Sequence, residues 1–209
     1  MKVAVSYISS NYSTEETIEL IDKSNADYIH VDLMDGKYVE VNNFEINDTL
    51  KLFSNTKKLL DIHLMVEEPE QYLLKLSKLN VDCITFHPKT TKYPEDLINI
   101  IKSLGLKAGI AINPDEEIDE FIDLFDKIDK IIVMSVKPGY GAQKFLDDVI
   151  PKINSLIDMK NDYNFLIEID GGINGESIKK LPNIDLVVSG SYVCKSNDFN
   201  KSIETLKKM

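Results

Sequence analysis

Short runs of apolar and β-branched residues recur along the chain at fairly even spacing, and a segment with helical periodicity follows most of them. Runs that are apolar at nearly every position are typical of parallel strands covered by helices. The pattern predicts eight strands, over residues 3–7, 28–32, 59–65, 83–87, 107–112, 131–136, 165–170 and 186–189.

Helix start signals lie between these runs. Residues 13–16 (STEE) read as a capping box that opens the first helix, and prolines precede or start two more. Asn174 is a plausible cap for a helix that follows the seventh strand. The predicted helices begin at the capping box and cover residues 45–56, 70–79, 95–103, 145–159, 175–181 and 198–208.

Eight strands that alternate with helices leave two architectures, a closed barrel or an open doubly wound sheet. The first strand is not followed by the Gly-x-Gly-x-x-Gly signature of dinucleotide-binding open sheets. The strand count and the length of 209 residues favour a (β/α)8 TIM barrel formed by residues 1–209 as a single domain.

Composition and charge restrict the partners. The net charge of −11 argues against nucleic acid or an anionic membrane, because both require clustered lysine and arginine. An anionic small molecule stays compatible, since backbone N–H groups can hold a phosphate. The cysteines, Cys83 and Cys194, suit a reducing compartment, and the N-terminus does not read as a signal peptide. We therefore expect a soluble cytoplasmic protein.

Polar side chains stand at the ends of three predicted strands, the end at which TIM barrels carry their active sites. His30 and Asp32 are two residues apart and therefore share a face, His63 ends the third strand, and Asp170 ends the seventh. Each alone could be a loop anchor. Two imidazoles and two carboxylates together predict a site for one divalent cation, with a donor set that suits zinc, iron(II), cobalt or manganese better than calcium or magnesium.

Glycines follow the last three strands, at 138–142 (PGYGA), at Gly171 and Gly172, and at Gly190 before Ser191. Any one of these segments could be only a tight turn. Three adjacent glycine-containing loops at the end of a barrel predict a phosphate-binding site, because backbone N–H groups can approach an anion there.

At these residues the chain resembles the ribulose-phosphate 3-epimerase family. The resemblance spans nearly the whole chain. The segments that carry it are 4–8 (AVSYI), 30–36 (HVDLMDG), 61–66 (DIHLMV), 86–87 (FH), 109–114 (GIAINP), 133–141 (VMSVKPGYG) and 169–173 (IDGGI).

The resemblance implies an isomerase of the pentose phosphate pathway that inverts C3 of ribulose 5-phosphate with one divalent metal ion per subunit. It implies that Asp32 removes the C3 proton, that the metal stabilises the resulting enediolate, and that Asp170 returns a proton to the opposite face. His30, Asp32, His63 and Asp170 would hold the metal. The implied substrate-binding residues are Ser6, His63, Gly139, Tyr140, Gly141, Ala142, Gly171, Gly172, Gly190 and Ser191, and Met34, Met65 and Met134 would line the pocket, although three buried methionines can also be ordinary core.

Three departures from the family pattern bear on the substrate. Residues 37–42 lack a usual proline, Ala142 replaces a common glycine, and Lys89 stands where an acidic residue is more usual. They keep a longer ketose phosphate such as D-allulose 6-phosphate open as the substrate.

A non-catalytic sugar-phosphate-binding barrel is a further alternative. A different enzyme class is also possible, because related phosphate-binding barrels decarboxylate or form carbon–carbon bonds. Those barrels generally centre on lysine and aspartate, whereas the strand ends here carry His30, Asp32 and His63 and are predicted to hold no inward lysine, which argues against that class. Barrels of this kind are commonly homo-oligomers, which we also expect here.

Overall fold

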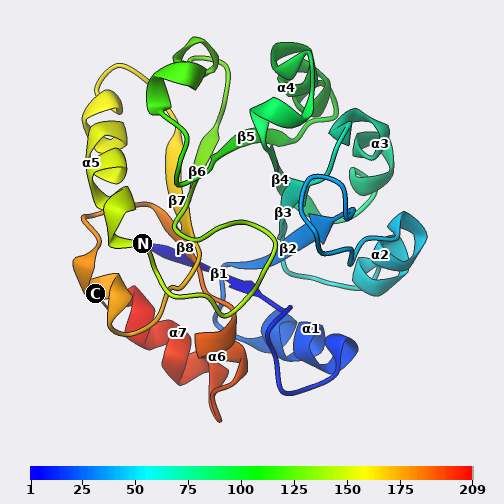
Figure 1. The fold of residues 1–209 in the computed structure, drawn as a ribbon. Helices are drawn as coiled ribbons and strands as arrows, with labels where there is room; N and C mark the ends of the chain where they lie inside the picture. Colours follow the sequence, from blue (N-terminus) through cyan, green and yellow to red (C-terminus); the bar gives the residue numbers. More distant parts are fainter. Residues whose placement is uncertain (209) are drawn as a thin grey trace.

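The computed structural model describes residues 1–208, and eight parallel strands close into a barrel in chain order with helices around the outside (Figure 1). The strands are β1 (Lys2–Ser6), β2 (Tyr28–Met34), β3 (Leu60–Met65), β4 (Val81–Phe86), β5 (Lys107–Ile112), β6 (Lys130–Met134), β7 (Leu166–Asp170) and β8 (Leu186–Val188). The predicted TIM barrel is confirmed, and all eight predicted strands are present with ends that differ by up to two residues.

The outer layer contains seven α-helices among the described residues: α1 (Thr14–Lys23), α2 (Ile46–Phe53), α3 (Leu73–Leu76), α4 (Pro94–Ser103), α5 (Ile150–Met159), α6 (Ser191–Cys194) and α7 (Phe199–Lys207). The capping box at Ser13 forms as predicted, with Glu16 as its second member. Asp198 likewise caps α7 by accepting from the Lys201 N–H.

Several outer segments are 3₁₀ turns, namely η1 (Pro69–Gln71), η2 (Pro88–Thr90), η3 (Ile118–Leu124), η4 (Asp147–Val149) and η5 (Ser177–Lys180). The helix predicted over 70–79 was therefore wrong in extent, because i→i+3 bonds such as Tyr72 N–H to Pro69 O break it into η1 and a single turn of α3. Asn174 does cap the segment after β7, but only a short 3₁₀ turn follows it. The sequence did not predict η3 or α6.

Each strand divides its side chains between two environments. Residues such as Ile29, Val31 and Leu33 of β2 belong to the apolar layer between the barrel and the helices, and all are buried. The alternate residues, His30 and Asp32, face the barrel interior, since they contact residues of β3 and β7. The main apolar core therefore lies outside the barrel, which leaves the interior free for polar groups.

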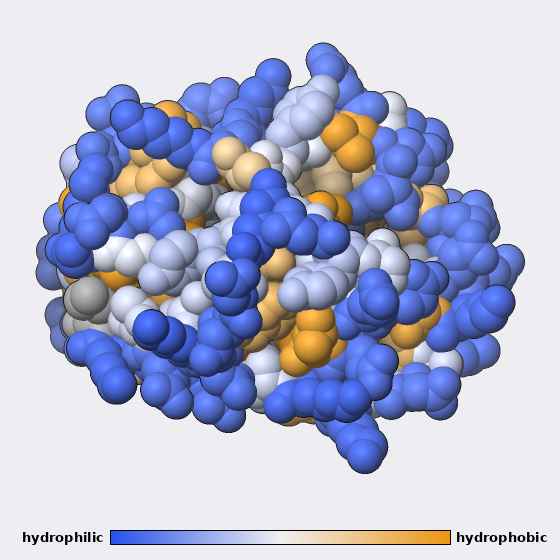
Figure 2. All heavy atoms as spheres, turned by 90° about the horizontal axis from the view of Figure 1, so that it is seen from below, coloured by the Kyte–Doolittle hydropathy of each residue, from blue (hydrophilic) through white to orange (hydrophobic). Residues whose placement is uncertain are grey.

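The face of the molecule below the barrel, as Figure 1 is drawn, is mostly polar. Figure 2 shows the side formed by α1, α6 and α7, where hydrophilic side chains dominate and apolar ones appear in small groups. This agrees with the net charge of −11. Among residues 1–208, no helix combines the length and the apolar character that crossing a bilayer requires. The expected homo-oligomer stays a prediction.

Candidate active site

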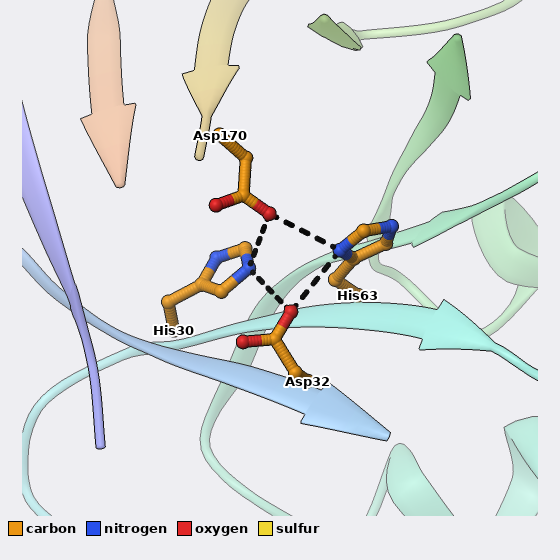
Figure 3. A group of neighbouring side chains, drawn as sticks. All are labelled: His30, Asp32, His63 and Asp170. Carbon is orange, nitrogen blue, oxygen red and sulfur yellow. Dashed lines mark hydrogen bonds and ion pairs between the residues drawn. The ribbon is translucent and has the colours of Figure 1, made fainter. Parts of the chain in front are cut away.

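The four predicted metal-ligand side chains, from the three strands β2, β3 and β7, meet at the carboxyl end of the barrel (Figure 3). His30 Nε2 and His63 Nδ1 each lie 3.2 Å from Asp32 Oδ1, and they lie 3.7 and 3.5 Å from Asp170 Oδ2. One ligand atom from each of the four residues lies within 4.8 Å of the others. The two carboxylates occupy opposite corners of this group and the two imidazoles occupy the other corners. The structure therefore brings together all four predicted metal ligands.

The register of the parallel sheet produces this convergence. Asp32 of β2 is the direct partner of His63 on β3, and the alternation along β2 places His30 on the same inner face. Asp170 ends β7, where it pairs with Met134 of β6. Because the strands are parallel, their carboxyl ends meet at one mouth of the barrel.

The electrostatics of the four residues suit a cation. Burial would raise the pKa of Asp32, but the charges and hydrogen bonds of His30 and His63 outweigh it and hold the pKa far below its ordinary value. Burial lowers the pKa of His30, yet Asp32, Asp61 and Asp170 raise it well above its usual range. The nearby carboxylates therefore favour protonation of both imidazoles. A divalent ion can replace those protons.

Each imidazole has a partner behind it. His30 Nδ1 lies 3.0 Å from Asp61 Oδ2, so that Nε2 faces the four-residue group. His63 Nε2 lies 3.0 Å from His87 Nε2, so that the other nitrogen of His63, Nδ1, faces the four-residue group. Burial and the nearby His63 hold the pKa of His87 well below its ordinary value, which keeps this ring neutral and able to accept a hydrogen bond. The supports orient one nitrogen of each ring toward the site.

A further buried cluster lies deeper in the barrel. The ammonium of Lys130 on β6 contacts the carboxyl groups of Asp61 on β3 and Glu168 on β7. Burial and the charge of Asp61 raise the pKa of Glu168 to about 8, while the charge of Asp61 raises that of Lys130 against the effect of burial. Sequence reasoning missed all three residues. Asp61 and Glu168 each stand two positions before a predicted ligand, so the period-two rule could have found them.

The cavity above the four residues brings the other predicted site residues together. Ser6 donates to Asp32 Oδ2 at 2.9 Å, and Met34, Met65 and Met134 are buried around the same cavity. Eight more predicted substrate-binding residues also line it, namely Gly139, Tyr140, Gly141, Ala142, Gly171, Gly172, Gly190 and Ser191. His63, which was predicted to contact the substrate as well as the metal, is fully buried and does not line the cavity. The hydroxyl of Tyr140 is turned away, and it donates to Glu40 Oε2 at 2.8 Å.

The backbone at two of these positions requires glycine. Gly171 and Gly172 have φ of 120° and 66°, and a Cβ on Gly172 would stand 2.3 Å from the Phe145 backbone nitrogen. Gly172 therefore allows close packing of the loops that follow β6 and β7. Ala142 adopts a left-handed φ of 57°, which glycine takes more easily. The alanine noted as a departure from the family thus occupies a strained position.

One of the three departures, Lys89, has charged partners. Lys89 forms ion pairs with Glu116 and Glu120, at 3.3 and 2.7 Å. It therefore joins the segment after β4 to the segment after β5. Gln143 donates to Lys137 O at 2.6 Å and to Tyr140 O at 2.8 Å, which closes the loop that contains Ala142.

The fold and the site define a TIM barrel with an inward His/Asp group beside glycine-containing loops. A profile described as the ribulose-phosphate 3-epimerase family matches residues 2–194. The ribulose-phosphate 3-epimerase of Helicobacter pylori is 36% identical over 99% of this chain and 97% of its own length, and that of Bacillus subtilis is 34% identical over 99% and 98%. The chain therefore belongs to the ribulose-phosphate 3-epimerase family, which is a family of carbohydrate isomerases.

Comparison with solved structures supports the fold alone. Phosphoribosyl anthranilate isomerase from Thermococcus kodakaraensis superposes with a TM-score of 0.61 over 99% of this chain and 97% of its own, at 15% sequence identity. At this sequence identity the similarity supports the barrel fold only and gives no information about the reaction.

Proposed function

We propose that this protein interconverts D-ribulose 5-phosphate and D-xylulose 5-phosphate by inverting the configuration at C3, as a step of the pentose phosphate pathway. The observation that carries the proposal is the placement of two carboxylates, Asp32 and Asp170, at opposite corners of one buried group. Family membership and the two similar epimerases support the substrate class.

Inversion at carbon needs one group that removes a proton and another that supplies one to the opposite face. In the proposed mechanism, Asp32 accepts the C3 proton of ribulose 5-phosphate and an enediolate forms. For this step Asp170 must start with a proton, which it donates to C3 from the other side. The turnover leaves Asp32 protonated and Asp170 ionised, and the two residues exchange roles in the reverse direction. Ser6, which donates to Asp32 Oδ2, orients the carboxylate for this transfer.

The donor set fits a divalent cation. His30, Asp32, His63 and Asp170 would hold one ion per subunit through two nitrogens and two carboxylate oxygens, a combination that suits Zn²⁺, Fe²⁺, Co²⁺ or Mn²⁺. A bound ion supplies positive charge that stabilises the negative oxygens of the enediolate. The second-sphere contacts of Asp61 and His87 keep the correct imidazole nitrogens toward this position.

The rest of the cavity suits a sugar phosphate. The glycine-containing loops after β6, β7 and β8 present backbone toward the cavity and would bind the phosphate, while the buried methionines Met34, Met65 and Met134 exclude water around the reacting carbon. The side chain of Tyr140 is directed toward Glu40, so we assign phosphate contact at this residue to its backbone.

Turnover of the metal-loaded protein tests the proposal. D-Ribulose 5-phosphate is supplied and xylulose 5-phosphate is measured by a coupled assay, with Asp126→Asn as a control that removes an exposed carboxylate. We expect activity in the wild type and in the control. Turnover of D-allulose 6-phosphate without turnover of the pentulose would establish the longer substrate. A metal-loaded protein that turns over neither compound is a binding barrel, which would contradict the proposal.

A further inference from the structure

The proposed mechanism assigns no role to the buried ion cluster of Lys130, Asp61 and Glu168, which lies below the proposed active site. Lys130, Asp61 and Glu168 are exposed by only 3%, 1% and 0%. They come from β6, β3 and β7, and β3 is not a neighbour of the other two strands, so their contacts cross the barrel interior. A lysine inside a barrel calls for a reason, because an ammonium ion loses its hydration there.

Stability does not supply the reason. The attraction between buried opposite charges roughly offsets their desolvation, and apolar residues of similar volume often serve as well or better. The interior layers of TIM barrels are ordinarily filled by branched apolar side chains. The role of Lys130 therefore depends on the residues that it contacts, above all Asp61.

Asp61 connects this group to the proposed active site. One of its oxygens, Oδ1, contacts Lys130, and the other, Oδ2, lies 3.0 Å from His30 Nδ1. A carboxylate that accepts from Nδ1–H leaves the lone pair of Nε2 directed at Asp32 and Asp170. The position of the Asp61 carboxylate thus decides which nitrogen of His30 the site receives.

The same atoms would also make a second cation site. His30 Nδ1 and carboxylate oxygens of Asp61 and Glu168 all lie within 4.8 Å of one another, and His30 Nδ1 is 3.7 Å from Glu168 Oε1. An ion bound there would displace the Nδ1 proton of His30 to solvent, so that His30 would bridge two ions as an imidazolate and lose its hydrogen bond to Asp61. Lys130 already contacts both carboxyl groups, so a fixed positive charge occupies the place of that ion.

We propose that Lys130 is a positioning residue: its ammonium replaces a second metal ion between Asp61 and Glu168, and it thereby keeps Asp61 as the hydrogen-bond partner of His30. The proposal rests on the metal site of the proposed function. According to this proposal, Lys130 limits each chain to one bound metal ion, although it would contact neither that ion nor the substrate.

Metal stoichiometry tests the proposal apart from turnover. Metal-free wild type, Lys130→Met and the double variant Lys130→Met/Glu168→Gln are titrated with Co²⁺, with bound ions counted by equilibrium dialysis and followed by visible absorption. We expect one ion per chain in the wild type, two in Lys130→Met, and one in the double variant, which lacks a ligand of the second site. Lys107→Met, which removes an exposed lysine paired with Asp82, should bind one.

One ion in Lys130→Met with wild-type affinity overturns the role of Lys130 and leaves the metal site standing. A wild type that binds no Co²⁺ overturns both. If circular dichroism shows that Lys130→Met is unfolded, Co²⁺ binding is measured in Lys130→Arg and Asp61→Asn instead. Lys130→Arg should keep the wild-type affinity for Co²⁺. Asp61→Asn should lose about 10- to 100-fold in affinity, because it weakens the hydrogen bond that orients a metal-binding imidazole. Unchanged affinity in Asp61→Asn overturns the proposal.

Discussion

Asp32 and His63 are direct register partners on β2 and β3, and Asp32 Oδ1 lies 3.2 Å from His63 Nδ1. Neighbouring parallel strands lie about 4.8 Å apart, so side chains that share a register position and a face must meet. The contact therefore follows from the pairing of two strands, and a slip of one residue would turn His63 out of the barrel.

Loss of the partner behind His63 should weaken metal binding. His87 Nε2 lies 3.0 Å from His63 Nε2, and His87→Leu leaves the N–H of His63 buried without an acceptor. We expect a decrease in Zn²⁺ affinity of about 10- to 100-fold, measured by competition with a chelating dye. His87→Gln keeps an acceptor and should restore part of the affinity. Equal affinity in His87→Leu and the wild type would show that this hydrogen bond does not orient His63.

The conformation of the loop after β6 should depend on the side chain of Gln143. Its side-chain amide donates to Lys137 O and Tyr140 O, so Gln143→Ala releases the loop that lines the cavity. We expect KM for the sugar phosphate to rise by about 10-fold, on the order of one charge-assisted contact, with little change in the free energy of unfolding. Gln71→Ala removes a similar amide-to-backbone bond away from the site and is the matched control. A KM that changes equally in both variants would contradict the prediction.

Ala142 should be a point of backbone strain. At a φ of 57° an alanine side chain crowds its own carbonyl, and glycine does not. Relief of this strain, about 1–2 kcal/mol, is partly offset because glycine makes the unfolded chain more flexible, so Ala142→Gly should raise the free energy of unfolding by about 0.5–1 kcal/mol net. Urea denaturation measures this change. A lower free energy of unfolding in the variant would mean that the loop relaxes the strain in another way.

Metal binding should release protons. In the metal-free protein, burial lowers the pKa of His30, but Asp32 and its neighbours raise it well above the ordinary value, so His30 carries a proton at pH 7. A metal ion must displace this proton, and affinity should therefore fall as the pH is lowered from 8 to 6. Calorimetric titration with Zn²⁺ in buffers of different ionisation enthalpy gives the number released. Zero release together with pH-independent affinity would contradict the raised pKa.

The fold could be predicted because its signals are local. Apolar runs located all eight strands, and the spacing of His30 and Asp32 correctly indicated a shared inner face. Helix extents were less predictable, as residues 69–79 show. There the chain between β3 and β4 buries Leu73 and Leu76 with one helical turn, and a longer helix is not required.

The alternation along the strands could have placed Asp61 and Glu168 on the inner face, but their ion pairs with Lys130 could not be predicted, for a different reason. The predicted sixth strand began at residue 131, while β6 begins one residue earlier, so Lys130 lay just outside the predicted strand. Its partner Asp61 lies across the barrel on β3, and only closure of the sheet brings the two together. Contacts of this kind depend on the register of all eight strands, which no single segment contains.

Exchange of the C3 hydrogen with solvent tests the two-aspartate account most directly. Metal-loaded wild type, Asp32→Asn and Asp170→Asn are incubated with D-ribulose 5-phosphate in D₂O, and deuterium at C3 is followed by NMR while metal content is measured in parallel. The account predicts deuterated xylulose 5-phosphate from the wild type. It predicts C3 exchange in ribulose 5-phosphate without epimerisation from Asp170→Asn, because Asp32 still removes and returns the proton, and no exchange from Asp32→Asn. Epimerisation at the wild-type rate by either metal-loaded variant would contradict it.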